Sequence, residues 1–341
     1  MERNWADLPP ELYIVILKKL PEICDFVRCR AVCKSWRTSS SVSDLPPQFP
    51  WILKRSEGPY LEFYSIIFNK VYAIRARCSS GKRLFGPAGG YLLTGQEGNA
   101  DSFSLLNPLN NRDVPLPVLH DCDPYLFPLN ICWFNPPSFQ IHDYMLLFEY
   151  GISVRCKPGD DRWDIIGPGH ECQYRCCYFK GFLFRVECET GVTKIMDISK
   201  ELYVIPPPKY EILSNMSLRG PYFVESCGEI LAICYNESKK RMAYKFYIHR
   251  LKFGNGKENP YWVKLSSIGD RIILFFDFTL VTGCGYKGNC IYFINKGSAF
   301  HLCDVHVIYM YDIENGETVL IYTPFIRGFP ITWFMPTLNH I

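Results

Sequence analysis

The first apolar pattern of the chain has the period of a helix. Within residues 8–20, LPPELYIVILKKL, every fourth position is apolar: Leu8, Leu12, Ile16 and Leu20. Tyr13 and Leu17 lie beside this stripe on a helical wheel, so a long side of the segment is apolar. The two prolines at its start fit only a first helical turn, and Pro21 is a stop signal. The pattern therefore predicts an amphipathic helix that ends before Pro21.

A second helical pattern follows and then fades. Residues 23–40, ICDFVRCRAVCKSWRTSS, place apolar side chains at helical spacing, with Asp25 as a possible N-cap. The next residues, SSSVSDLPPQFP, are rich in Ser and Pro, which is typical of a connecting segment. We therefore expect a helical module at 1–45 and a linker at 46–59. A module this small needs a partner for its apolar faces, either another protein or the rest of this chain.

From residue 60 onward the pattern changes to short strands and turns. Three stretches share a strand, a turn with glycine and a second strand: YFKGFLFRVE, ESCGEILAICY and GYKGNCIYFIN. Their glycines, Gly181, Gly228 and Gly288, recur near the roughly 50-residue repeat of some propeller blades. A mainly β chain with a propeller-like domain of about six blades at 60–338 is the favoured fold class. A pair of packed β-sheets is the alternative.

Composition narrows the classes of partner. The chain has 341 residues and a formal net charge of +3, with dispersed Lys and Arg, so we expect no nucleic-acid partner. No apolar run reaches the roughly 18 residues of a spanning helix, so we also expect no membrane insertion. Sixteen cysteines without a secretory signal indicate reduced thiols in the cytoplasm or nucleus.

The sequence offers little support for catalysis or metal binding. The cysteines lack the paired spacing of a zinc site. Asp160, Asp161 and Asp164 cluster in what reads as a polar hairpin turn, and His301 and His306 have no paired nucleophile. Serine-hydrolase, zinc-protease and P-loop motifs are absent from the sequence. We therefore predict no cofactor, no metal and no catalytic residue.

The helical module resembles a known motif. The runs LPPEL (8–12), IL (16–17), LP (20–21) and VCKSWR (32–37) resemble the F-box in order and spacing. This resemblance implies three helices that bind a Skp-type adaptor, which links the protein to a cullin and a RING protein in a ubiquitin ligase. The resemblance also implies an adaptor-binding set: Leu8, Pro9, Leu12, Ile16, Leu17, Leu20, Val32, Cys33 and Trp36.

The larger region also resembles a family, the plant domain of unknown function (DUF295) that commonly follows an F-box and is related to kelch-like F-box proteins. Its marks include NPL (107–109), CKPGDDRWDIIG, YFVESCGEILAI and the closing WFMP (333–336). This chain departs from the family pattern at GPAGGYLLTGQEGNADSF, where Tyr91 replaces a common tryptophan. The resemblance implies an architecture and no ligand.

Three functional hypotheses follow. The first is a non-catalytic, substrate-recognition subunit of a Skp-cullin-F-box ligase, whose propeller recruits an unknown protein target. The second is a protein-interaction scaffold that uses the same helices without ubiquitin transfer. The third, a propeller enzyme, would require a substrate-dependent rate that survives removal of residues 1–45. The sequence does not identify the target, because specificity would lie in loops that carry no recognisable chemistry.

Overall fold

The structure of the chain is a computed structural model. The residues it describes are 5–20, 22–45, 48–54, 60–76, 82–88, 90–96, 99–118, 144–147, 153–156, 160–165, 174–180, 182–197, 200–210, 217–238, 243–254, 259–276, 279–284, 287–297, 305–322, 332–336 and 338.

The N-terminal residues 5–45, the helical module, contain three α-helices. They are α1 (Pro10–Leu17), α2 (Ile23–Val32) and α3 (Lys34–Thr38), with short 3-10 helices at Trp5–Asp7 and Val42–Asp44. The second predicted segment is two helices because Cys33 is extended, with φ −154° and ψ 169°. Its Sγ accepts a hydrogen bond from the backbone N–H of Trp36 at 3.4 Å and so caps α3. Glu22, not Asp25, occupies the N-cap of α2, and Pro21 lies outside the described residues.

The remaining described elements are strands in six sheets. Sheet 1 contains β1 (Trp51–Lys54), β2 (Tyr60–Ser65), β3 (Lys70–Arg75) and β24 (Thr332–Phe334). Sheet 2 contains β4 (Lys82–Ala88), β5 (Tyr91–Gln96), β6 (Asn99–Asn107) and β7 (Arg112–Pro115). Sheet 3 contains β8 (Tyr144–Leu147), β9 (Ser153–Cys156) and β10 (Asp164–Ile165).

The second half of the chain forms the other three sheets. Sheet 4 contains β11 (Tyr174–Phe179), β12 (Phe182–Glu187), β13 (Thr193–Asp197) and β14 (Lys200–Ile205). Sheet 5 contains β15 (Ser217–Ser226), β16 (Glu229–Ser238), β17 (Ala243–Lys252) and β18 (Tyr261–Leu265). Sheet 6 contains β19 (Arg271–Phe276), β20 (Thr279–Cys284), β21 (Cys290–Gly297), β22 (Val305–Asp312) and β23 (Thr318–Tyr322).

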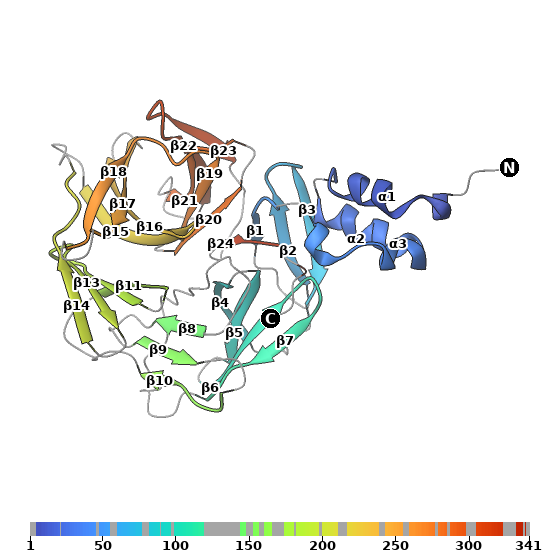
Figure 1. Cartoon of the computed structure of the whole chain (residues 1–341), viewed down its shortest axis with the longest axis horizontal. Helices are drawn as coiled ribbons and strands as arrows, with labels where there is room; N and C mark the ends of the chain where they lie inside the picture. Colours follow the sequence, from blue (N-terminus) through green and yellow to red (C-terminus); the bar gives the residue numbers. More distant parts are fainter. Residues whose placement is uncertain are drawn as a thin grey trace.

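These sheets follow one another around a ring, with the helices outside it (Figure 1). Neighbouring sheets meet through their inner strands, in the contacts β11 with β15, β15 with β20, β19 with β24, and β24 with β4. The predicted fold class is confirmed: the chain is mainly β, and the six sheets are the blades of a β-propeller. We call β1–β24 the ring.

The ring is closed by strands from both ends of the chain. In sheet 1, C-terminal β24 pairs antiparallel with N-terminal β1, and Trp51 lies opposite Phe334. The predicted linker at 46–59 therefore needs correction, because Trp51–Lys54 form β1 in the sheet that closes the ring. The Ser- and Pro-rich residues 39–50 just before it concealed this four-residue strand, whose first three side chains, Trp51, Ile52 and Leu53, are buried.

Apolar side chains fill the spaces between sheets 4 and 5, 5 and 6, 6 and 1, and 1 and 2. Between sheets 5 and 6 the core is aromatic, with Phe246 lying 4.9 Å from Tyr311 and 5.4 Å from Phe293 between ring centroids. Side chains on the other face of sheet 5, such as Phe223, pack instead against sheet 4. A strand buried on both faces explains the nearly continuous apolar runs that the sequence shows in β16 and β19.

Two of the three predicted glycine hairpins are confirmed. β11 with β12 and β15 with β16 are antiparallel neighbours, and the second turn uses Cys227 at φ 52° and Gly228 at φ 76°. Gly181 lies outside the described residues. The third expected hairpin is wrong: the segment before Gly288 does not pair with β21, whose neighbour on that side is β19, in parallel. The hairpin partner of β19 is β20.

Candidate functional site

The helical module has a packed side and an exposed side. Tyr13 and Leu17 of α1 are buried together with Phe26 of α2. The Tyr13 ring lies 4.6 Å from the Trp36 ring between centroids, and the Trp36 indole N–H donates to the Trp5 carbonyl at 3.1 Å. Tyr13 and Leu17 thus form the core side of α1, which leaves the neighbouring positions to face solvent.

The exposed side carries aliphatic side chains that nothing in the described chain covers. Three of them share one side of α1, and two belong to α2: Leu12, Val15, Ile16, Val27 and Val32. We call these five residues the exposed aliphatic set. Large aliphatic side chains gathered on so small a module are unusual on a surface that stays in water. They indicate a surface that another protein covers.

The predicted adaptor-binding residues divide between these two sides. Leu12, Ile16 and Val32 are exposed and belong to the set, and Pro9 is exposed beside them. Leu17 is buried, while Leu8, Leu20 and Trp36 pack against the module's core. Cys33 caps α3. The structure therefore places the first group where a partner could touch it, and the others where they support the helices.

Sequence reasoning missed three exposed residues of the module. Val15 and Val27 are exposed, as is Trp5, which precedes the stretch with helical spacing. The signal for Val15 was present, since it lies three positions after Leu12 and next to Ile16 on a helical wheel. The four-residue stripe obscured it, because that stripe combined an outward pair, Leu12 and Ile16, with residues that pack inward.

Polar and ionisable groups of the module are mostly structural. Asp25 and Arg28 form an exposed ion pair at 2.9 Å. Arg30 donates to the Ser40 carbonyl at 2.6 Å and so fixes the segment that leaves α3. Burial raises the pKa of the Cys24 and Cys29 thiols, which keeps them protonated at neutral pH. Neither of these two thiols is therefore activated as a nucleophile.

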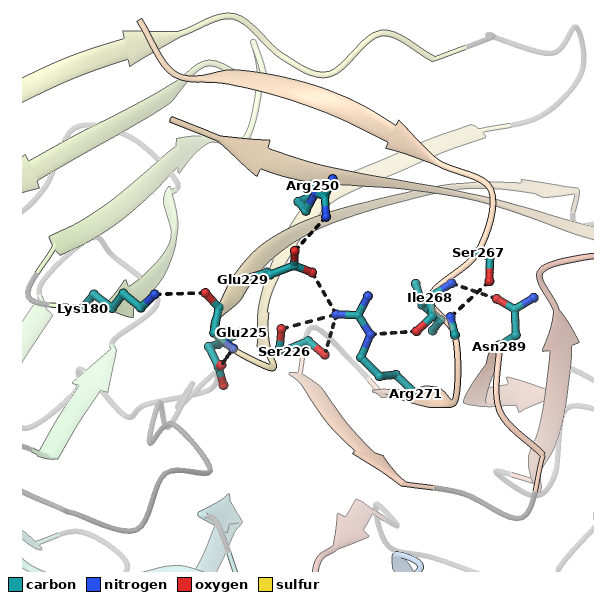
Figure 2. Close-up of polar contacts among 11 residues, drawn as sticks. Lys180, Glu225, Ser226, Glu229, Arg250, Ser267, Ile268, Arg271 and Asn289 are labelled. Atoms are coloured by element: carbon teal, nitrogen blue, oxygen red, sulfur yellow. Dashed lines mark hydrogen bonds and ion pairs between the residues drawn. The ribbon is translucent and has the colours of Figure 1, made fainter. Parts of the chain in front are cut away.

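The ring carries a second group of interest, a polar network at one edge of sheets 4, 5 and 6 (Figure 2). The Glu229 carboxylate accepts from Arg250 at 2.8 Å and from Arg271 at 3.1 Å. Lys180 donates to the Gly228 carbonyl at 3.1 Å, which links sheet 4 to the β15–β16 turn. Each of these cationic side chains therefore contacts a neighbouring strand or sheet, and the network holds the blades together.

The acidic and histidine residues singled out in the sequence do not form a metal site in the described part of the chain. The described residues contain no group of three His, Cys, Asp or Glu side chains that could hold a metal ion. Asp160 and Asp161 are exposed in the bend before β10, and His306 lies in β22. His301 lies outside the described residues. None of the described helices is long and apolar enough to cross a membrane.

Comparison with known families separates the same two parts. The F-box-like family matches residues 5–45, which are the helical module. The KIB1-4 beta-propeller family matches residues 63–322, which span most of the ring. The chain belongs to the KIB1-4 beta-propeller family. As an F-box-like module joined to a KIB1-4 propeller, it has the organisation of a substrate-recognition F-box protein, and both parts of the sequence resemblance are confirmed.

Proteins similar to most or nearly all of the chain carry the name F-box protein. An Arabidopsis thaliana F-box protein, At5g66830, is 22% identical over 97% of this chain and 93% of its own length. F-box protein At2g17036 of the same plant is 21% identical over 93% of this chain and 90% of its own length. F-box/kelch-repeat protein At1g57790, also from A. thaliana, is 26% identical over 72% of each chain. The KIB1-4 protein is thus similar to F-box proteins from end to end.

Proposed function

We propose that this KIB1-4 protein is the substrate-recognition subunit of a Skp-cullin-F-box ubiquitin ligase. Its helical module binds a Skp-type adaptor, through which the protein joins a cullin and a RING protein. The ring recruits a protein target, and the bond-forming chemistry belongs to the partners. The protein would work in the cytoplasm or nucleus, where such partners and reduced thiols occur together.

The observation that carries this proposal is the exposed aliphatic set on a module whose other side is already packed. Burying a fully exposed Leu, Ile or Val side chain contributes about 1.5–3 kcal/mol, and these five are 39–64% exposed, so each would contribute roughly half of that when a partner covers it. The F-box-like match over the same helices supports an adaptor as the partner. Leu12, Ile16 and Val32 are the residues we propose to touch it directly, with Pro9 beside them.

A reconstitution with purified components tests the role. The full chain is mixed with a plant Skp-type adaptor, a cullin and a RING protein, and the assembly is analysed by size-exclusion chromatography with mass determination. We expect one complex that contains all four proteins. A complex of adaptor and chain that excludes the cullin would instead support an interaction scaffold without ligase function. Failure to bind the adaptor at all would contradict both.

A further inference from the structure

The helical module is joined to the ring by a buried carboxylate. Glu22, at the N-cap of α2, is only 4% exposed. Its Oε2 accepts a hydrogen bond from the Tyr72 hydroxyl at 2.6 Å, and its Oε1 accepts from the Lys70 ammonium at 3.2 Å. Both donors come from β3, the outer strand of sheet 1. A buried carboxylate that loses such donors is strongly destabilised, because its charge is then away from water and unpaired, so this contact favours the docked position of the module.

Apolar packing continues from the same point into the ring. Ile23, the residue after Glu22, is buried in the core between sheets 1 and 2, together with Trp51, Phe63 and Leu92. Its backbone N–H donates to the Gln48 side-chain oxygen at 2.9 Å. The first turn of α2 is therefore part of the ring's core, whereas the exposed aliphatic set is not part of this core.

The C-terminal end of the chain adds a third contact. Leu338, four residues after β24, packs against the core of sheets 1 and 2 and also against the core of the helical module. Leu45, which leaves the module, contacts the same two cores. Two segments from opposite ends of the sequence thus bridge the module and the ring, beside the sheet that closes the ring (Figure 1).

A flexible tether would look different. A module that moved freely would keep its charged residues in water and would expose a polar surface toward the ring. In this chain Glu22 and Ile23 are instead buried at the junction, and Leu338 packs there. The interdomain surface is also distinct from the exposed aliphatic set, so both can be occupied at the same time.

We propose that Glu22, Ile23 and Leu338 are positioning residues that hold the adaptor-binding helices in one fixed orientation relative to the ring. The inference deepens the proposed function, because a rigid junction sets the distance and direction at which the ring presents a target to adaptor-bound partners. The adaptor surface and the ring then move as one body, and the junction adds no contact to the adaptor.

Distance measurements on the full chain test this junction without any partner. Spin labels on noncanonical residues replace exposed Lys18, after α1, and exposed Lys200, in sheet 4 across the ring, and electron–electron double resonance records their separation. We expect one narrow distance distribution in the parent chain. We expect Glu22→Ala and Leu338→Ser to broaden it, and Glu22→Gln, which keeps an acceptor for Tyr72, to give an intermediate width.

Two further variants separate the junction from general folding. The double change Lys70→Ala with Tyr72→Phe alters the ring side only and leaves the sequence of the helices intact, and an unchanged helical circular dichroism signal would show that broadening in this variant does not come from unfolded helices. Glu11→Ala, an exposed glutamate on α1, is the matched control and should leave the width unchanged. Adaptor affinity should stay within about twofold in every junction variant. A broad distribution in the parent, or one that stays narrow in both Glu22→Ala and the double variant, would overturn the proposal whether or not the adaptor binds.

Discussion

Arg271, at the start of β19, reaches across the boundary between sheets 5 and 6 and contacts Glu229, at the start of β16. Its Nη1 lies 3.1 Å from Glu229 Oε2, while Arg250 holds the other carboxylate oxygen at 2.8 Å (Figure 2). Burial alone would raise the pKa of Glu229, but hydrogen bonds from the two arginines lower it below the usual value. Arg271 also donates from Nε to the Ile268 carbonyl at 2.7 Å. One side chain therefore joins two blades.

Removing this side chain should weaken the ring. Arg271→Ala deletes the contacts to Glu229 and Ile268 and leaves a partly buried carboxylate with one cation, so we expect a loss of about 2 kcal/mol in the free energy of unfolding. Urea denaturation followed by tryptophan fluorescence measures it. Arg112→Ala, at an exposed position on β7, is the control and should change stability by less than about 0.5 kcal/mol. Equal losses of stability in both variants would show that the network does not hold the blades together.

Closure of the ring depends on Trp333. This residue of β24 is 3% exposed, packs with Ile52 and Leu274, and donates its indole N–H to the Phe275 carbonyl at 3.3 Å. Trp333→Ala should cost about 3–5 kcal/mol, the usual range for a buried tryptophan. Trp5→Ala removes an equal volume from a position 70% exposed and should leave the main thermal transition unchanged. If the two variants melt alike, sheet 1 does not close the ring.

His249 should make stability depend on pH. It is buried on β17, and its Nε2 contacts the Lys209 carbonyl at 3.0 Å. On the two neighbouring strands, Lys264 of β18 and Ala232 of β16 lie opposite it. Burial, with a smaller effect from Lys264, lowers its pKa below the ordinary 6.5. The unfolded chain therefore binds a proton more readily, so this contribution to stability is complete above pH 6.5 and decreases as the pH falls below it.

Thermal unfolding between pH 7.5 and pH 5 checks this sign. We expect the midpoint temperature of the parent chain to fall over this range. His249→Gln can still donate to the Lys209 carbonyl but cannot titrate, and it should show a smaller fall. A parent chain and variant with the same pH profile would mean that protonation of His249 is not linked to folding.

The sequence predicted the class of both parts because their patterns are local. Helical spacing around Tyr13 and Leu17, and the turn at Cys227 and Gly228, depend on residues close together in the chain. The strand at Trp51–Lys54 was missed because it follows the Ser- and Pro-rich residues 39–50, and because one of its two partners, β24, comes from the other end of the sequence. The same applies to the parallel pairing of β19 with β21, which a local hairpin rule cannot foresee.

Which apolar residues of α1 face outward could not be predicted from the sequence, for a related reason. Apolar spacing shows that α1 has apolar residues, but not which of them the module itself buries. Leu8 and Leu12 belong to the same apolar stripe in the sequence, yet Leu8 packs against the module's core and Leu12 faces solvent. The contact of Glu22 with Tyr72 joins residues far apart in the chain, and no spacing rule could have indicated it.

The proposed function depends on the outward side of α1. Leu12 and Ile16, 54% and 39% exposed, are changed together to Asp, which removes their burial against the adaptor and places two charges at the contact. Because about half of each side chain is already covered, burying the rest of both contributes roughly 1.5–3 kcal/mol, and the two buried charges add a further cost, so the affinity for the adaptor should fall at least ~100-fold. Because both residues face solvent, the module should stay folded in the free chain.

The matched control makes the same change at a different place. Val319 and Leu320 on β23 are 44% and 53% exposed, and their double change to Asp adds the same charge to the ring without touching the helices. The decisive measurement is the dissociation constant for the purified Skp-type adaptor, by isothermal titration calorimetry, in the parent chain and both double variants. We predict a loss of at least ~100-fold for Leu12→Asp with Ile16→Asp, and less than about threefold for Val319→Asp with Leu320→Asp. Equal affinity in all three chains would contradict the adaptor-binding role of these helices.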